Sequence, residues 1–143
     1  MPTPTDVTRV AFVCVQNAGR SQMAAAIAER ERRDRGLTAA VDVVTGGTDP
    51  ADRVHPVVVD AMAELGIDVA DRAPRELTRE ELDSADYVVT MGCDAADVCP
   101  ATWTGENRDW GLDDPHGKPL SEVRTIRDDV ERRVAALFDE LEG

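Results

Sequence analysis

Short apolar runs alternate with longer amphipathic segments along this chain. The runs at residues 7–13, 39–45 and 86–91 are rich in valine and other strand-forming residues and predict buried strands. A shorter fourth strand is predicted at residues 108–112. The pair Gly46-Gly47 is expected to end the second strand, because glycine often interrupts a strand.

Helical periodicity fills the segments between the runs. A helix is predicted over residues 21–35 with Gly36 as its stop signal, and another from Pro56 to Gly66. A capping box, Thr78-Arg79-Glu80-Glu81, begins a short helix, and Ser121 is expected to cap a long final one. Their inner faces are predicted to carry Met23, Ala24, Ile27 and Ala28, then Val58, Met62 and Leu65, and finally Val123, Ile126, Val130, Val134, Leu137 and Leu141.

This alternation predicts an α/β fold. Right-handed crossovers would make it a small doubly wound, four-stranded parallel sheet with helices on both faces. The 143 residues suffice for one domain, and we expect it to span residues 1–143. Ligands of such sheets bind beyond the carboxyl ends of the strands, which is where Cys14, Cys93 and the loop after Trp110 fall.

The charge balance excludes some partners. A formal net charge of −13, from 16 basic and 29 acidic residues, argues against nucleic acid and anionic membranes. Lys118 is the only lysine, which is typical of an acidic halophile-like surface or of a GC-rich genome. No apolar run could cross a membrane and no signal-peptide pattern is present, so we expect the protein in the cytoplasm. We also expect it to be a monomer.

The most informative chemistry follows the first strand. A Cys-x5-Arg loop between a strand and a helix can bind an oxyanion through backbone N–H groups and the helix N-terminus. The positive electrostatic potential of the loop and helix end favours the thiolate of Cys14. Arg20 has a planar guanidinium group that can bind two oxygens of the anion, and Ser21 can donate a hydrogen bond to the sulfur. A cysteine at a strand end can also be a small buried apolar residue. The predicted oxyanion-binding residues are Cys14, Val15, Gln16, Asn17, Ala18, Gly19, Arg20 and Ser21.

Two further segments could take part in the reaction. The run Asp113-Asp114-Pro115 can supply a proton to a departing oxygen, or can simply form a turn. Cys93 and Cys99 could form a disulfide during turnover, or one or both could be inert. Three cysteines with no histidine at ligand spacing near the later pair favour nucleophilic or redox chemistry over a metal site.

Four segments together resemble the low-molecular-weight protein tyrosine phosphatase superfamily and, within it, the arsenate reductases. They are residues 12–24, residues 86–91, Cys99-Pro100, and residues 109–115. The resemblance implies that Cys14 is the nucleophile, Arg20 binds the oxyanion, Asn17 holds the loop shape and Asp114 is the general acid. Ala25 replaces a glutamate that helps bind potassium in some reductases, so that ion site is not expected. No cofactor is expected either.

The run after the acid separates reductase from phosphatase. Tyrosine phosphatases of this family usually follow Asp-Pro with an aromatic residue, whereas His116 follows here, as in the reductases. The resemblance implies that arsenate binds at Cys14 and that a second thiol, Cys93, Cys99 or an external one, releases arsenite. In the thioredoxin-coupled reductases the later cysteines are seven positions apart, whereas Cys93 stands six before Cys99. The expected reductant is therefore either thioredoxin or a low-molecular-weight thiol such as mycothiol with a glutaredoxin-like partner.

Two other functions compete with this prediction. The same loop would let a phosphatase hydrolyse phosphotyrosine or phosphoarginine through a phosphocysteine on Cys14. A non-catalytic oxyanion-binding protein is the third possibility, but it would not need Cys14, Arg20 and Asp114 together.

Overall fold

A computed structural model of the chain describes residues 7–14, 17–47, 49–91, 106–110, 112, 115 and 117–142. Its elements in chain order are β1 (Thr8–Cys14), α1 (Arg20–Asp34), β2 (Val41–Gly47), α2 (Pro56–Ala63), α3 (Arg79–Asp83), β3 (Tyr87–Thr90), β4 (Glu106–Asp109) and α5 (Leu120–Glu142). The four strands form one sheet in the order β2-β1-β3-β4, and every pairing is parallel. The predicted α/β architecture with a parallel sheet is confirmed.

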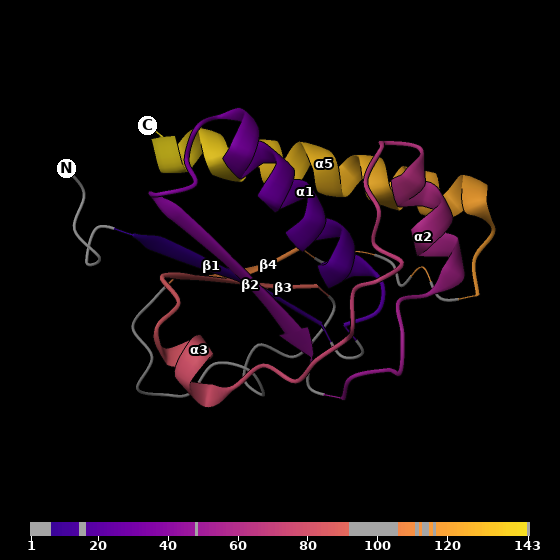
Figure 1. Ribbon diagram of the computed structural model, residues 1–143, viewed down its shortest axis with the longest axis horizontal. Coiled ribbons are helices and arrows are strands. Elements are labelled where there is room, and N and C mark those ends of the chain that lie inside the picture. The colour runs from indigo at the N-terminus through magenta and orange to yellow at the C-terminus, as the bar shows by residue number, and fades with distance from the viewer. Residues whose placement is uncertain are drawn as a thin grey trace.

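The side chains of β1 alternate between the two faces of the sheet. Val10 and Phe12 point into the larger core, which α1, α2 and α5 cover. Ala11 and Val13 point to the other face, where Leu82 of α3 packs. Figure 1 shows α1, α2 and α5 on one side of the sheet and α3 on the opposite side.

The helix faces agree with the predicted periodicity. All the residues predicted for the inner face of α1 are buried, and so are Val58 and Met62 of α2. The stripe predicted along α5 is buried except at Leu141, which is only partly covered. The Thr78 capping box is present, since Thr78 and Glu81 exchange side-chain and backbone hydrogen bonds.

Three predicted boundaries are wrong. β2 continues through Gly46 and Gly47, which pair with Val13 and Cys14 of β1. Glycine is needed at position 46 because a Cβ atom there would lie 2.7 Å from the Leu77 nitrogen. β4 begins at Glu106 and ends at Asp109, before Trp110 leaves the strand to pack on Phe12 with ring centroids 5.8 Å apart. Ser121 lies inside α5, which begins at Leu120.

The start of α5 is explained by its backbone hydrogen bonds. The Pro119 carbonyl accepts from the N–H groups of Glu122, at 3.0 Å, and of Val123, at 3.1 Å. Pro119 therefore takes the position before the first helical residue that Ser121 was predicted to hold.

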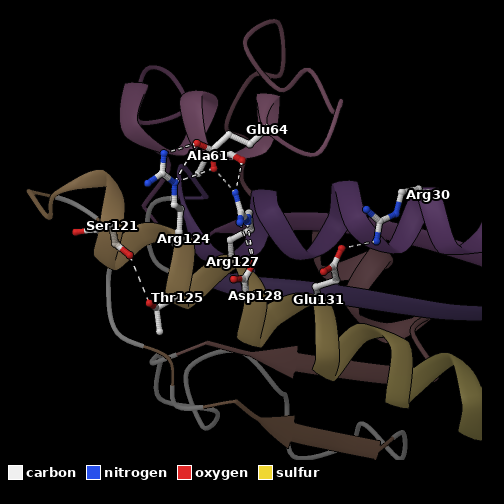
Figure 2. A network of polar contacts seen from close by, with 9 residues as sticks. All are labelled: Arg30, Ala61, Glu64, Ser121, Arg124, Thr125, Arg127, Asp128 and Glu131. Atoms are coloured by element: carbon white, nitrogen blue, oxygen red, sulfur yellow. Dashed lines mark hydrogen bonds and ion pairs between the residues drawn. The ribbon is translucent and has the colours of Figure 1, made fainter.

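Ion pairs fix α5 against both α1 and α2 (Figure 2). Arg30 of α1 contacts Glu131, at 2.8 Å between Nη2 and Oε2. Arg127, whose side chain is largely buried, donates to the Ala61 carbonyl at 2.9 Å and to Glu64 just beyond α2. None of the helices in these described ranges is long and apolar enough to cross a bilayer.

Candidate active site

The candidate site lies at the carboxyl end of β1, in the middle of the sheet. β1 pairs with β2 on one side and with β3 on the other, so the order in which strands are added to the sheet changes direction at β1. Crevices at such points are where open α/β sheets bind their ligands. Cys14 is the last residue of β1, and α1 begins six residues later at Arg20.

The Cys14 sulfur is buried and receives hydrogen bonds. It lies 2.8 Å from the Ser21 hydroxyl oxygen, and the Asn17 backbone N–H donates to it over 3.2 Å. The residue is 3% exposed. These partners, together with the N-terminal end of α1, stabilise negative charge on the sulfur.

Asn17 shapes the loop around this sulfur. Its φ of 51° lies in the left-handed region, where asparagine is one of the few residues with a side chain that is found regularly. Its Nδ2 group donates to Ser21 over 2.8 Å and to Thr45 over 2.9 Å. Its Oδ1 atom accepts from Gln22 over 3.0 Å and from the Arg75 backbone N–H over 3.1 Å.

Each hydrogen bond around Asn17 has a defined donor and acceptor. The Thr45 hydroxyl donates to the Phe12 carbonyl over 2.8 Å, so it accepts from Asn17. The Ser21 oxygen accepts from the same amide group, which leaves its own proton to be donated to the Cys14 sulfur. The network therefore turns Ser21 into a donor to Cys14, and two donors converge on the sulfur.

Arg20 brings a cation to the first turn of α1. Its Nη1 group donates to the Leu112 carbonyl over 2.9 Å, which ties the start of the helix to the chain beyond β4. The first turn of α1 contains no acidic side chain. A positive guanidinium and a helix N-terminus at one place suit an anionic ligand.

Pro115 and His55 lie against the loop at Gly19. A Cβ atom on Gly19 would lie 2.7 Å from Cγ of Pro115 and 3.5 Å from Cδ2 of His55. The His55 backbone N–H donates to the Ala18 carbonyl over 2.9 Å. The chain immediately after the predicted acid thus lies directly against the loop that carries Cys14.

The structure brings together most of the predicted loop residues. Cys14, Asn17, Ala18, Gly19, Arg20 and Ser21 all lie at this site. The other predicted site residues, Val15, Gln16, Asp114, Cys93 and Cys99, lie outside the described residues. Within the described ranges, no three His, Cys, Asp or Glu side chains are grouped as metal ligands.

Three contributors were missed by the predictions from sequence. Thr45 and Arg75 reach the loop from distant parts of the chain, and Gln22 from the first turn of α1. A polar residue at the end of an apolar strand, just before Gly46, was the available signal for Thr45. Gln22 lies in the segment 12–24 that carries the family resemblance, but no role was predicted for it. Neither periodicity nor a motif distinguished Arg75.

Comparison with known proteins agrees with this architecture. The sequence pattern of the low molecular weight phosphotyrosine protein phosphatase family matches residues 9–143. A Halobacterium salinarum protein provisionally named an arsenate reductase is 54% identical over 133 residues, which are 93% of this chain and 92% of that protein.

Solved structures extend the likeness to three dimensions. A thioredoxin-dependent arsenate reductase of Corynebacterium glutamicum superposes with a TM-score of 0.78 and 32% identity, over 98% of this chain and 64% of that one. A structure described as an arsenate reductase in the phosphate binding state has a TM-score of 0.78 and 30% identity, over 94% of this chain and 98% of that one. On the match of the family pattern and the identity to the Halobacterium protein, the chain belongs to the low molecular weight phosphotyrosine protein phosphatase family.

Proposed function

We propose that the protein is an arsenate reductase that converts arsenate to arsenite through a covalent adduct on Cys14. The observation that carries the proposal is the convergence of the Ser21 hydroxyl and the Asn17 N–H on the Cys14 sulfur, at the N-terminal end of α1. Relatives named as arsenate reductases support this choice of reaction. The position of the site between β2 and β3 supports treating the chain as one doubly wound domain.

The first chemical step forms the adduct. Arsenate is held by the Arg20 guanidinium and by backbone N–H groups of the loop between β1 and α1. The Cys14 thiolate attacks arsenic, the S–As bond forms and one As–O bond breaks. Asp114 protonates the oxygen that leaves, so that it departs as water. The contact of Pro115 with the loop supports this role for the residue before it.

The second step moves two electrons to arsenic. A second thiolate attacks the Cys14 sulfur, a disulfide forms, and the electron pair of the S–As bond stays on arsenic. Arsenic is reduced from As(V) to As(III), leaves as arsenite, and the two sulfurs are oxidised. We assign the second thiol to Cys93 or Cys99, or to an external low-molecular-weight thiol.

The reductant must return the sulfurs to their thiol form. Thioredoxin would reduce a disulfide within the chain, and the Corynebacterium reductase is named as thioredoxin-dependent. A glutaredoxin-like protein would instead resolve a mixed disulfide with a small thiol. The two routes differ in whether Cys93 and Cys99 are needed.

A phosphatase is the second candidate, and membership of the phosphatase family favours it. Phosphate and arsenate are tetrahedral anions of similar size and the same charge, so the Cys14 loop would bind either. Transfer of a phosphoryl group to Cys14 and hydrolysis by water would need no second thiol.

The test measures arsenite formed from arsenate in high KCl. Reactions contain thioredoxin with its reductase, a small thiol with glutaredoxin, or no reductant, and Cys14→Ser is the blank. We expect turnover that depends on a reductant and disappears in Cys14→Ser. Loss of turnover with thioredoxin in Cys93→Ser or Cys99→Ser would assign the relay. If no arsenite forms while para-nitrophenyl phosphate is hydrolysed, the reductase proposal fails and the phosphatase remains.

A further inference from the structure

Arg75 contacts the active-site loop from the segment between α2 and α3. Its backbone N–H donates to Asn17, its carbonyl accepts from Gly47, and its guanidinium reaches Thr45 and Glu81. Four contacts from one residue thus join the loop, the edge strand β2 and the helix α3.

The main chain at this point is held against β2. The Gly47 N–H donates to the Arg75 carbonyl over 2.8 Å, and Gly47 forms a parallel bridge with Glu76. Gly46 permits the close approach of Leu77, as its missing Cβ shows. The segment 75–77 therefore covers the outer edge of β2 where that strand reaches the active site.

The side chain of Arg75 provides a second attachment. Nη1 donates to the Thr45 carbonyl over 2.9 Å, and Nη2 pairs with the Glu81 carboxylate. Glu81 is itself fixed, because it is the third residue of α3 and completes the capping box with Thr78. The Arg75 hydrogen bond, helped by the Thr78 N–H, lowers the pKa of Glu81, so the pair is charged at neutral pH.

The backbone N–H of Arg75, together with the side-chain amide of Gln22, fixes the orientation of the Asn17 amide. An N–H donor requires the oxygen of the amide on its side, which places Nδ2 toward Ser21 and Thr45. With the amide reversed, its NH₂ group would face the Arg75 donor and its oxygen would face Ser21. The Ser21 proton would then be drawn to Asn17 and away from the Cys14 sulfur.

From these contacts we propose that Arg75 is a positioning residue for the nucleophile. Through Asn17 and Ser21 it maintains the hydrogen bond that stabilises the Cys14 thiolate. The inference rests on the proposed function only in taking Cys14 as the nucleophile. The effect of Arg75 on the sulfur passes through Asn17 and Ser21.

The test compares Arg75→Ala with the matched control Arg72→Ala. Arg72 belongs to the same segment and pairs with Glu29 of α1, but it makes none of the contacts described for Arg75. The rate of iodoacetamide alkylation is measured from pH 5 to 9 in a Cys93→Ser/Cys99→Ser background, so that Cys14 alone reacts. Thermal unfolding is recorded for every variant.

Arg75→Ala keeps the backbone N–H but removes the guanidinium that attaches this segment to Thr45 and Glu81, so the hydrogen bond to Asn17 is weakened rather than deleted. We expect its alkylation at pH 6 to be slower by about threefold to tenfold, up to the size of one hydrogen bond to a charged group. Its profile should move to higher pH, while Arg72→Ala stays within about twofold of the parent. Arg75→Lys keeps one cation but cannot fork to both Thr45 and Glu81, so an intermediate rate is expected. Arg75→Lys and Glu81→Gln carry the test if Arg75→Ala does not fold.

Unchanged alkylation profiles in the Arg75 variants, or an equal change in Arg72→Ala, would overturn the inference. Arsenite production by the chain with its native cysteines is measured in parallel. If that chain makes no arsenite but Arg75→Ala alkylates slowly, the inference stands and the reductase proposal falls. If that chain makes arsenite and Arg75→Ala alkylates normally, the reductase stands and the inference falls.

Discussion

The Nη1 atom of Arg127 lies 2.6 Å from Oε1 of Glu64, which joins the middle of α5 to the end of α2. Arg124 pairs with the same carboxylate at 2.6 Å, so one acidic group holds two guanidinium groups. Together their hydrogen bonds lower the pKa of Glu64 from its usual 4.5 to about 2, and that of Arg124 contributes most.

This pKa predicts how Glu64 affects stability with pH. A carboxylate with a lowered pKa contributes stability that is complete above pH 4.5 and is lost as the pH falls toward 2. Glu64→Gln should therefore lower the free energy of unfolding at pH 7 and converge with the parent near pH 2. Urea unfolding at several pH values measures the difference. Glu122→Gln, which removes an exposed α5 carboxylate 3.7 Å from Lys118, is the control and should have little effect.

Removal of the Ser21 hydroxyl tests the donor to the sulfur. Ser21→Ala leaves only the Asn17 N–H on Cys14, and we expect alkylation at pH 6 to fall by about tenfold. Ser84→Ala removes an exposed hydroxyl that donates to the Glu81 carbonyl and should alkylate normally. Equal rates in the two variants would show that Ser21 does not assist the thiolate.

Thr45 predicts a combined loss of stability and reactivity. Thr45→Val keeps the shape but leaves the Phe12 carbonyl and an Asn17 N–H without their partner, at a cost of about 1–3 kcal/mol. Thr45→Ser restores the hydroxyl and should recover Cys14 alkylation. Chemical unfolding and alkylation are measured on both variants, and a valine variant as reactive as the serine variant would contradict the network.

Phe138 tests the core between the sheet and α5. The ring is fully buried, and Phe138→Ala should lower the free energy of unfolding by about 3–5 kcal/mol. Leu141→Ala, one turn further along and only partly covered, should cost clearly less. Urea denaturation of both variants decides, and similar losses would mean that the end of α5 is packed more evenly than the structure indicates.

The acidic surface predicts an unusual response to salt. With a net charge of −13, screening of self-repulsion should raise the melting temperature as KCl increases from about 0.01 M, where the Debye length is roughly 30 Å, to about 1 M, where it is roughly 3 Å. Sucrose at equal osmolality controls for exclusion of solutes from the surface. A melting temperature that falls with salt would mean that surface pairs such as Arg35–Asp139 dominate instead.

Local sequence predicted the strands, helices and nucleophile loop, because periodicity and short motifs record which face each residue buries. It failed where tertiary contacts decide. β4 consists of Glu, Asn, Arg and Asp and has no apolar pattern, yet it pairs with β3 through its backbone. The local pattern predicts that Gly46 ends the strand, although its missing side chain is what lets Leu77 approach a continuing strand.

The site shows the same division. Cys14, Arg20 and Ser21 follow one another within a single loop, so their spacing alone indicates an oxyanion site. Arg75 stands 58 positions after Asn17, and only folding of the chain brings its backbone N–H to the Asn17 side-chain amide. No local pattern could have indicated that contact.

The residues that hold Asn17 come from distant parts of the chain, so the reactivity of the Cys14 sulfur depends on the complete fold. In the folded chain, Ser21 donates to Cys14 while Thr45 on β2 and the segment at Arg75 both hold Asn17. A chain that has lost this fold lacks these donors, and its Cys14 has the reactivity of an ordinary exposed thiol. Completion of the fold arms the nucleophile, and loss of the fold disarms it.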